Sequence, residues 1–103
     1  MNRQFTAFVC YSFAQGIEVA YHLRKRNLRV PDDVSIAVFN NPELAGFTAP
    51  AMTCLEIPVR EMGVSAAELL LKKYEDGAYR NGETVTFQGK LIVRESTGPC
   101  RKP

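Results

Sequence analysis

Two adjacent amides, Asn40 and Asn41, are the side chains of this sequence best suited to bind a small polar molecule. Each carboxamide offers two donors and one acceptor. They directly follow residues 34–39, an apolar run typical of a parallel strand covered on both faces. Ligands of open α/β sheets bind at the carboxyl ends of the strands. The pattern therefore fits a ligand contact, but it also fits an Asx turn that ends the strand.

No group of residues has the spacing of a catalytic or metal centre. His22 has neither a nucleophile nor an orienting acid in a recognisable motif around it. Ser12 lacks the flanking glycines of a nucleophile elbow, so we interpret it as a helix cap. The sequence has three cysteines, Cys10, Cys54 and Cys100. Their odd number and wide spacing favour reduced thiols over a disulfide framework. We predict no enzymatic activity, no metal and no cofactor.

Composition favours a small cytoplasmic domain. With 103 residues and a net charge of +2, the chain suits one modest domain and gives no electrostatic reason to bind nucleic acid or membranes. No apolar run approaches the roughly 20 residues of a membrane span, and the first residues lack a signal-peptide core. Arg24, Lys25, Arg26 and Arg29 are interpreted as a solvated face.

Residues 5–39 predict a strand–helix–strand unit. Residues 5–11 are apolar and aromatic, as in a strand. Ser12 and Gln15 then have the form of a capping box, and Asn27 is suited to a left-handed helix end. The strands at 5–11 and 34–39 should therefore be parallel, because a helix connects them.

The rest of the chain predicts fewer elements than a complete layered domain needs. We expect a loop or short helix at 42–50, a strand at 52–57, a helix from 58 to the stop signal at 76–77, and strand segments within 84–94. Residues 95–103 are polar and predict a frayed tail. This is an α/β pattern whose thin sheet would leave apolar surface uncovered. Either the chain is part of a larger protein or it self-associates.

Several separate motifs occur in the order in which one family of bacterial regulators has them. They are residues 27–36, the doublet 40–41, residues 50–53, residues 61–63 with 66–70, and residues 93–99. On these motifs the chain resembles the C-terminal part of the effector-binding domain of the lactose/galactose repressor (LacI/GalR) family. The resemblance spans nearly all of residues 5–99.

The resemblance implies an α/β parallel-sheet sandwich, a partial periplasmic-binding-protein-like type I fold. Residues 5–57 would belong to the C-terminal lobe, 58–76 would be a helix of the N-terminal lobe, and 84–99 would form the returning strand. The family's DNA-binding helix-turn-helix is absent from residues 1–103, so contact with DNA would depend on that element. No membrane partner is implied.

By the same resemblance, the chain would be the sensor portion of a sugar-responsive transcriptional repressor. It would bind a sugar or related polar metabolite through Asn40, Asn41, Phe39 and Tyr11. The sequence departs from the family pattern at three places. Asn40 stands where many members carry aspartate, and Ile57 stands where they often have glutamine. The connection at Tyr11–Ser12 is about two residues shorter than in the family. The alternative on the same fold is a solute-binding protein of a sugar transport system.

The family also implies a homodimer. Part of its interface would be formed by the first helix, through Gln15, Glu18 and Val19. The loop after the amides would contribute Phe47 and Thr48. The alternative is a local turn in which Phe47 packs into its own core.

Overall fold

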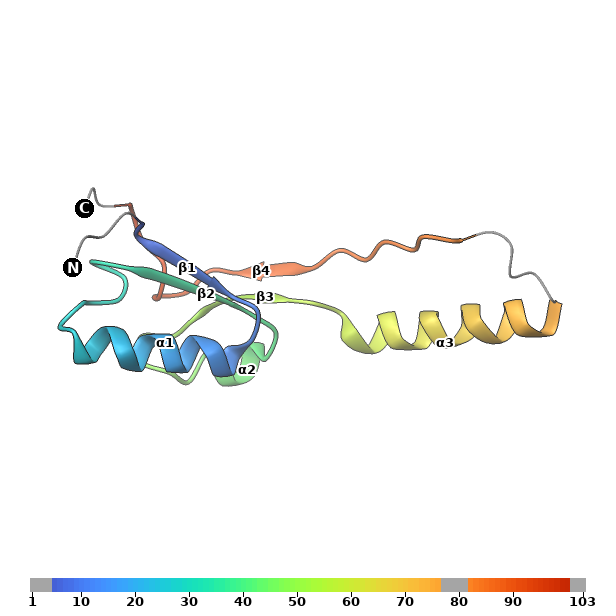
Figure 1. Cartoon of the computed structure of the whole chain (residues 1–103), viewed down its shortest axis with the longest axis horizontal. Coiled ribbons are helices and arrows are strands. Elements are labelled where there is room, and N and C mark those ends of the chain that lie inside the picture. The colour runs from blue at the N-terminus through green and yellow to red at the C-terminus, as the bar shows by residue number, and fades with distance from the viewer. Residues whose placement is uncertain (1–4, 77–81, 101–103) are drawn as a thin grey trace. The chain divides into compact units, whose positions relative to one another are not determined.

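The structure is a computed structural model that describes residues 5–76 and 82–100. These residues form two compact units, which are described separately (Figure 1). The first unit comprises the described residues up to Glu56 together with those from Lys90 onward, and the second is Ile57–Gly89.

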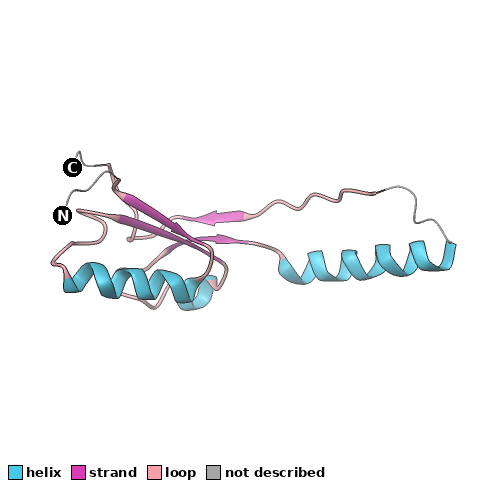
Figure 2. Ribbon diagram, viewed as in Figure 1, coloured by secondary structure: helices cyan, strands magenta, loops and turns pink. Residues whose placement is uncertain are grey.

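The first unit contains a four-stranded, mostly parallel sheet in the order β1-β2-β3-β4 (Figure 2). Its strands are β1 Ala7–Cys10, β2 Ser35–Phe39, β3 Thr53–Glu56 and β4 Lys90–Ile92. The first three are parallel to one another, and β4 is antiparallel to β3. Helices α1 Phe13–Lys25 and α2 Pro42–Ala45 connect the parallel strands. The predicted α/β class and the parallel pairing of β1 with β2 are confirmed.

One face of the sheet carries the core of the first unit. Phe8 pairs with Ile36, and Cys10, Val38 and Cys54 lie side by side on three strands. Their side chains pack with buried residues of α1 and α2, which lie on the same side of the sheet (Figure 2). Because β2 has a neighbour on each side, residues 35–39 form an interior strand.

The other face of the sheet is open among the described residues. Val9 and Val93 are 73% and 70% exposed, and Leu91 is 62% exposed. On β2 only alternate residues are fully buried, and Ala37 and Phe39 are half-buried. The expectation that β2 is covered on both faces is therefore wrong for this chain. The expectation of an uncovered apolar surface is confirmed.

Helix α1 begins and ends where the sequence predicts. The Oγ atom of Ser12 accepts from the Gln15 amide at 3.2 Å, and Oε1 of Gln15 accepts from the Tyr11 amide at 3.2 Å. At the other end Asn27 has a φ of 59°, in the left-handed region. The Asn27 amide donates to the Arg24 carbonyl and the Leu28 amide to the Leu23 carbonyl, which is a Schellman motif.

Asp33 stabilises the turn that leads into β2. Its carboxylate accepts from the Arg29 amide at 2.8 Å and lies 3.4 Å from the Arg29 Nε atom. The amides of Asp33 and Val34 both donate to the Arg29 carbonyl. The tight turn predicted before the strand is therefore present, and one member of the basic cluster is balanced by acidic side chains.

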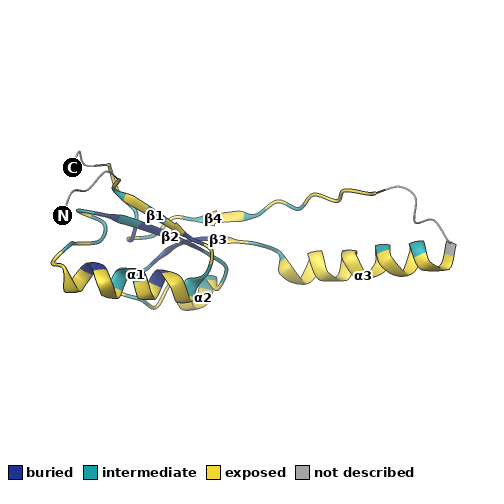
Figure 3. Ribbon diagram, in the orientation of Figure 1, coloured by how far each residue is buried: buried dark blue, intermediate teal, exposed yellow. Residues whose placement is uncertain are grey.

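The second unit consists of α3 Val59–Asp76 and the described residues that follow it up to Gly89. The helix starts one residue after Pro58 and ends at Asp76, while the predicted glycine stop, Gly77, lies outside the described residues. Most of α3 is exposed (Figure 3), including Leu70 at 66% and Tyr74 at 73%. Among the residues described, no helix has the length and apolar character needed to cross a membrane.

The C-terminal part departs from the expectations in two places. One of the expected strand segments is present after Gly89, as β4 Lys90–Ile92, but the described residues 82–89 have no strand pairing. Residues 95–100 are also not frayed, because Ser96 is completely buried and Glu95 accepts from the Ala51 amide at 3.2 Å. A polar sequence indicated a tail, but its polar groups bond to backbone of the core instead. Residues 101–103 lie outside the described part.

Candidate functional site

Parallel pairing places the residues that follow β1 and β2 at one edge of the sheet. Cys10, the last residue of β1, is in register with Val38, and Phe39, the last residue of β2, is in register with Leu55. Tyr11 and Asn40 therefore leave neighbouring strands at the same edge. This edge is where small molecules bind in open α/β sheets.

Asn40 is fixed at this edge by its backbone. Its φ is 65°, its amide donates to the Leu55 carbonyl at 2.8 Å, and its carbonyl accepts from the Cys54 thiol at 3.2 Å. The residue is half-buried. Asparagine tolerates left-handed φ better than most side chains. The position thus anchors a carboxamide on a rigid strand end.

Asn41 has a different role from Asn40. Its φ is 52°, it occupies the N-cap position of α2, and its side chain makes no capping hydrogen bond. The residue is exposed, and Pro42 follows as the first helical residue. Its backbone conformation turns the chain from β2 into the helix, which agrees with a loop-shaping role.

The remaining predicted ligand contacts differ in exposure. Phe39 is half-buried on the open face of the sheet, beside Leu55. Tyr11 is 75% exposed. The two cavities that border α1 include neither of these side chains and neither amide. The strand-end edge is therefore separate from both of these cavities.

The predicted interface residues fall on two sides of α1. Gln15, Glu18 and Val19 line a groove of about 640 Å³ between α1 and β1. Thr48 lies at the other side of the helix, where its hydroxyl contacts the Ala45 and Pro50 carbonyls at 3.1 and 3.0 Å. Phe47 is 86% exposed, so the alternative in which it packs into its own core is wrong.

The two cysteines of the strands have raised pKa values. Burial raises the pKa of the Cys54 thiol; Glu56 raises it further and Arg94 opposes the shift. Burial also raises the pKa of the Cys10 thiol. A raised pKa keeps a thiol protonated and therefore poorly nucleophilic. Within the described ranges, no cluster of three or more potential metal ligands occurs.

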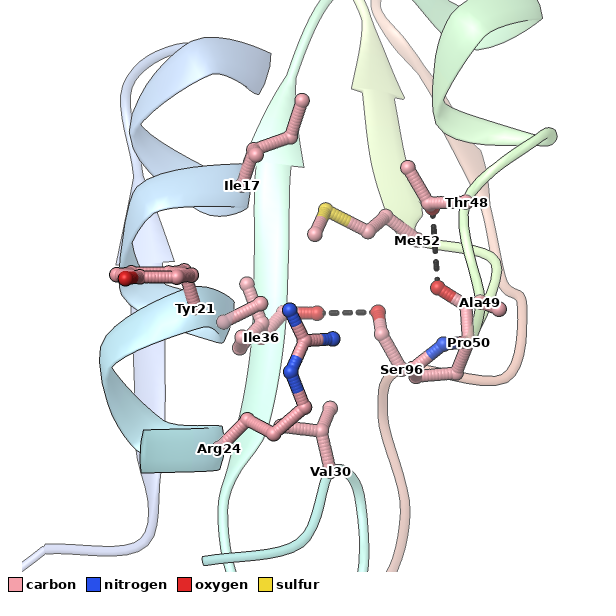
Figure 4. Close-up of a pocket in the computed structure, with 11 residues that line it drawn as sticks. Ile17, Tyr21, Arg24, Val30, Ile36, Thr48, Ala49, Pro50, Met52 and Ser96 are labelled. Carbon is pink, nitrogen blue, oxygen red and sulfur yellow. Dashed lines mark hydrogen bonds between the residues drawn. The ribbon is translucent and has the colours of Figure 1, made fainter. Parts of the chain in front are cut away.

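Sequence reasoning missed a cavity on the other side of α1 that includes Arg24 (Figure 4). The sequence shows this residue only as one of several adjacent cations. The residues that line the cavity come from four separate stretches of chain, so no local pattern could have indicated it.

Comparisons with known proteins identify the domain family and the fold. The sequence model of the protein family described as periplasmic binding protein-like domain matches residues 2–97. The arabinose metabolism transcriptional repressor of Geobacillus stearothermophilus is 38% identical over 92 residues, which are 89% of this chain and 25% of that repressor. The chain thus spans about a quarter of the length of this curated relative.

Solved structures of regulators share the fold. A putative transcriptional regulator LacI from Bacillus cereus subsp. cytotoxis has a TM-score of 0.81 and 28% identity, over 95% of this chain and 34% of that one. A LacI family transcriptional regulator from Enterococcus faecalis with bound ribose has a TM-score of 0.78 and 25% identity, over 97% and 37%. The chain belongs to the periplasmic binding protein-like domain family, in the form that LacI-type transcriptional regulators contain.

Proposed function

We propose that this chain is the sensor portion of a cytoplasmic, sugar-responsive transcriptional repressor. It binds a sugar or a related polar metabolite and does no chemistry on it. Asn40 provides hydrogen bonds, Phe39 an apolar wall, and Tyr11 and Asn41 flank them. The named relatives are regulators rather than transport proteins, which favours this function over solute delivery.

The position of Asn40 is the observation that carries the proposal. Its carboxamide sits on a half-buried residue directly after an interior parallel strand, and two hydrogen bonds to β3 fix its backbone. Small-molecule sites combine apolar walls with a few well-placed polar groups. Asn40 and Phe39 supply one of each at the edge of the sheet.

The two units correspond, in this proposal, to parts of two lobes. Residues 5–57 and the returning segment belong to the C-terminal lobe, and the helix 58–76 belongs to the N-terminal lobe. The division of the described chain near residue 57 supports this assignment. An effector that binds the closed lobes more tightly than the open ones shifts their equilibrium, which couples occupancy to DNA affinity. The DNA contact itself would be made by a helix-turn-helix outside residues 1–103.

Dimerisation is the second part of the proposal. Two surfaces would form the interface of a homodimer. One is the exposed Phe47 with Thr48, and the other is the part of the groove lined by Gln15, Glu18 and Val19. An exposed aromatic side chain is a common anchor of such interfaces.

The test is calorimetric titration of the protein with pentoses, hexoses, disaccharides and nucleosides, comparing Asn40→Gly with Asn41→Gly. Both residues have positive φ, so glycine keeps the backbone conformation and removes only the carboxamide. We expect Asn40→Gly to weaken binding by about tenfold or more, and Asn41→Gly to change it little. Absence of heat with every compound, or equal losses in the two variants, would contradict the proposal.

A further inference from the structure

A cavity of about 260 Å³ lies between α1 and the segment 48–50 (Figure 4). Its wall is mostly apolar. The aliphatic and sulfur-containing lining residues are Ile17, Ala20, Val30, Ile36, Ala49, Pro50 and Met52. Ordinary ligand pockets measure about 300–1,000 Å³, so this one suits a small molecule.

The serine and threonine hydroxyls of the cavity are already bonded within the protein. Ser96 donates to the Ile36 carbonyl and accepts from the Thr53 amide. Thr48 contacts the carbonyls of Ala45 and Pro50. These two hydroxyls would therefore not select the ligand of this cavity.

Arg24 is the charged residue of the cavity, and no carboxylate lines it. Figure 4 shows its side chain reaching from the end of α1 toward the segment that carries Ser96. In the part of the chain that the structure describes, its guanidinium has neither an ion pair nor a hydrogen bond. A guanidinium beside an apolar wall favours an anion, and guanidinium groups match carboxylates in shape.

We propose that this cavity binds a small monocarboxylate with an apolar body. The apolar body would pack against Ile17, Ala20 and Pro50, which line the cavity and are not fully buried. The carboxylate would pair with Arg24. The site is separate from the strand-end edge, because Ile36 is near the start of β2 and Asn40 follows its end. It does not depend on the proposed sensor function.

The experiment is an NMR titration of the 103-residue chain with phenylacetate and with phenylacetamide, followed by amide chemical shifts at low salt. The two probes share an aromatic body and differ in charge. Arg24→Gln removes the proposed partner. Arg26→Gln is the matched control, since it removes the same charge from the same turn but does not line this cavity.

The expected result is saturable binding of phenylacetate with shifts at Ala20, Ile36 and Met52 and none at Asn40. Phenylacetamide and the Arg24→Gln variant should each bind about tenfold more weakly, as expected for loss of a charge-assisted hydrogen bond. Arg26→Gln should bind as the parent does. The proposal is overturned if phenylacetate does not bind, if the amide binds equally, or if both variants lose affinity alike. If the chemical shifts of the same residues change with protein concentration in the absence of any probe, a second copy of the chain occupies the cavity. That result would also overturn the proposal.

Discussion

The hydroxyl of Ser96 donates a hydrogen bond to the backbone carbonyl of Ile36, although the two residues are 60 positions apart. The same oxygen accepts from the Thr53 amide at 2.8 Å. Ser96 is completely buried, and its own backbone exchanges hydrogen bonds with Ile36 and Ala51. One side chain thus ties the C-terminal segment to both central strands of the sheet.

Replacing Ser96 should be among the costliest polar substitutions in the chain. Ser96→Ala leaves the Thr53 amide and the Ile36 carbonyl without this partner, and all three residues are buried. An unsatisfied buried group costs about 1–3 kcal/mol, so we expect the free energy of unfolding to fall by about 2–4 kcal/mol. Urea denaturation followed by circular dichroism measures it.

Ser35→Ala is the control for this substitution. Ser35 also bonds the C-terminal segment, through the Gly98 amide at 3.1 Å, but it is only half-buried. Because water can replace that bond, its loss should cost less than about 1 kcal/mol. Equal effects of the two substitutions would show that burial at Ser96 is not what matters.

Gly16 and Gly63 are both helical but should respond oppositely to alanine. A Cβ on Gly16 would overlap the Cγ1 atom of Val38, and it would lie 3.1 Å from the sulfur of Met52. Gly63 has open space at the same position. We expect Gly16→Ala to lower the free energy of unfolding by about 1–3 kcal/mol through overpacking.

Gly63→Ala should instead stabilise α3 by up to about 1 kcal/mol, because alanine has the higher helix propensity. Thermal and urea denaturation of both variants would check this. A stabilising effect of Gly16→Ala would contradict the close approach of α1 to Val38 on β2.

The three cysteines should differ in reactivity. Cys100 is exposed, whereas burial raises the pKa of the Cys10 and Cys54 thiols above their ordinary value of 9.0. A raised pKa leaves less thiolate at a given pH, and thiolate is the reactive form. With iodoacetamide at about pH 8, Cys100 should be alkylated first, as followed by peptide mass spectrometry.

Because burial raises their pKa above 9.0, alkylation of the buried pair should still be accelerating with pH at pH values near 9.0. Cys100→Ser should remove the rapid phase and leave the slow phase unchanged. A rapid phase that survives this substitution would place a reactive thiolate at Cys10 or Cys54.

Local signals made the N-terminal half of the fold predictable. The Ser12 cap, the left-handed Asn27 and the apolar run before Asn40 each report on neighbouring residues only. The C-terminal segment was not predictable in this way. Arg94 and Ser96 look like surface residues, but their partners Met52 and Ile36 lie more than forty positions away.

The same distinction applies to the candidate sites. Asn40 could be predicted because a strand end and a carboxamide are adjacent in sequence. Arg24 could not, because its cavity combines α1, the start of β2 and the segment 48–50. Its cationic neighbours also indicated a solvated face. Its position over the apolar cavity becomes visible only when these segments are assembled.

The proposed dimer gives the last prediction. Phe47 is 86% exposed, so Phe47→Glu should leave the free energy of unfolding almost unchanged. If this side chain anchors a homodimer, the added charge should raise the dimer dissociation constant by about tenfold or more. Light scattering over a dilution series measures it.

Val93→Glu is the matched control, because Val93 is 70% exposed and lies on the open face of the sheet rather than near α2. This substitution introduces the same charge at another exposed apolar residue. If the chain associates through general hydrophobic contacts, both substitutions should weaken the dimer equally. A parent chain that stays monomeric at high concentration would contradict the dimer directly. Selective weakening by Phe47→Glu, with Val93→Glu behaving as the parent, is what a specific interface at Phe47 requires.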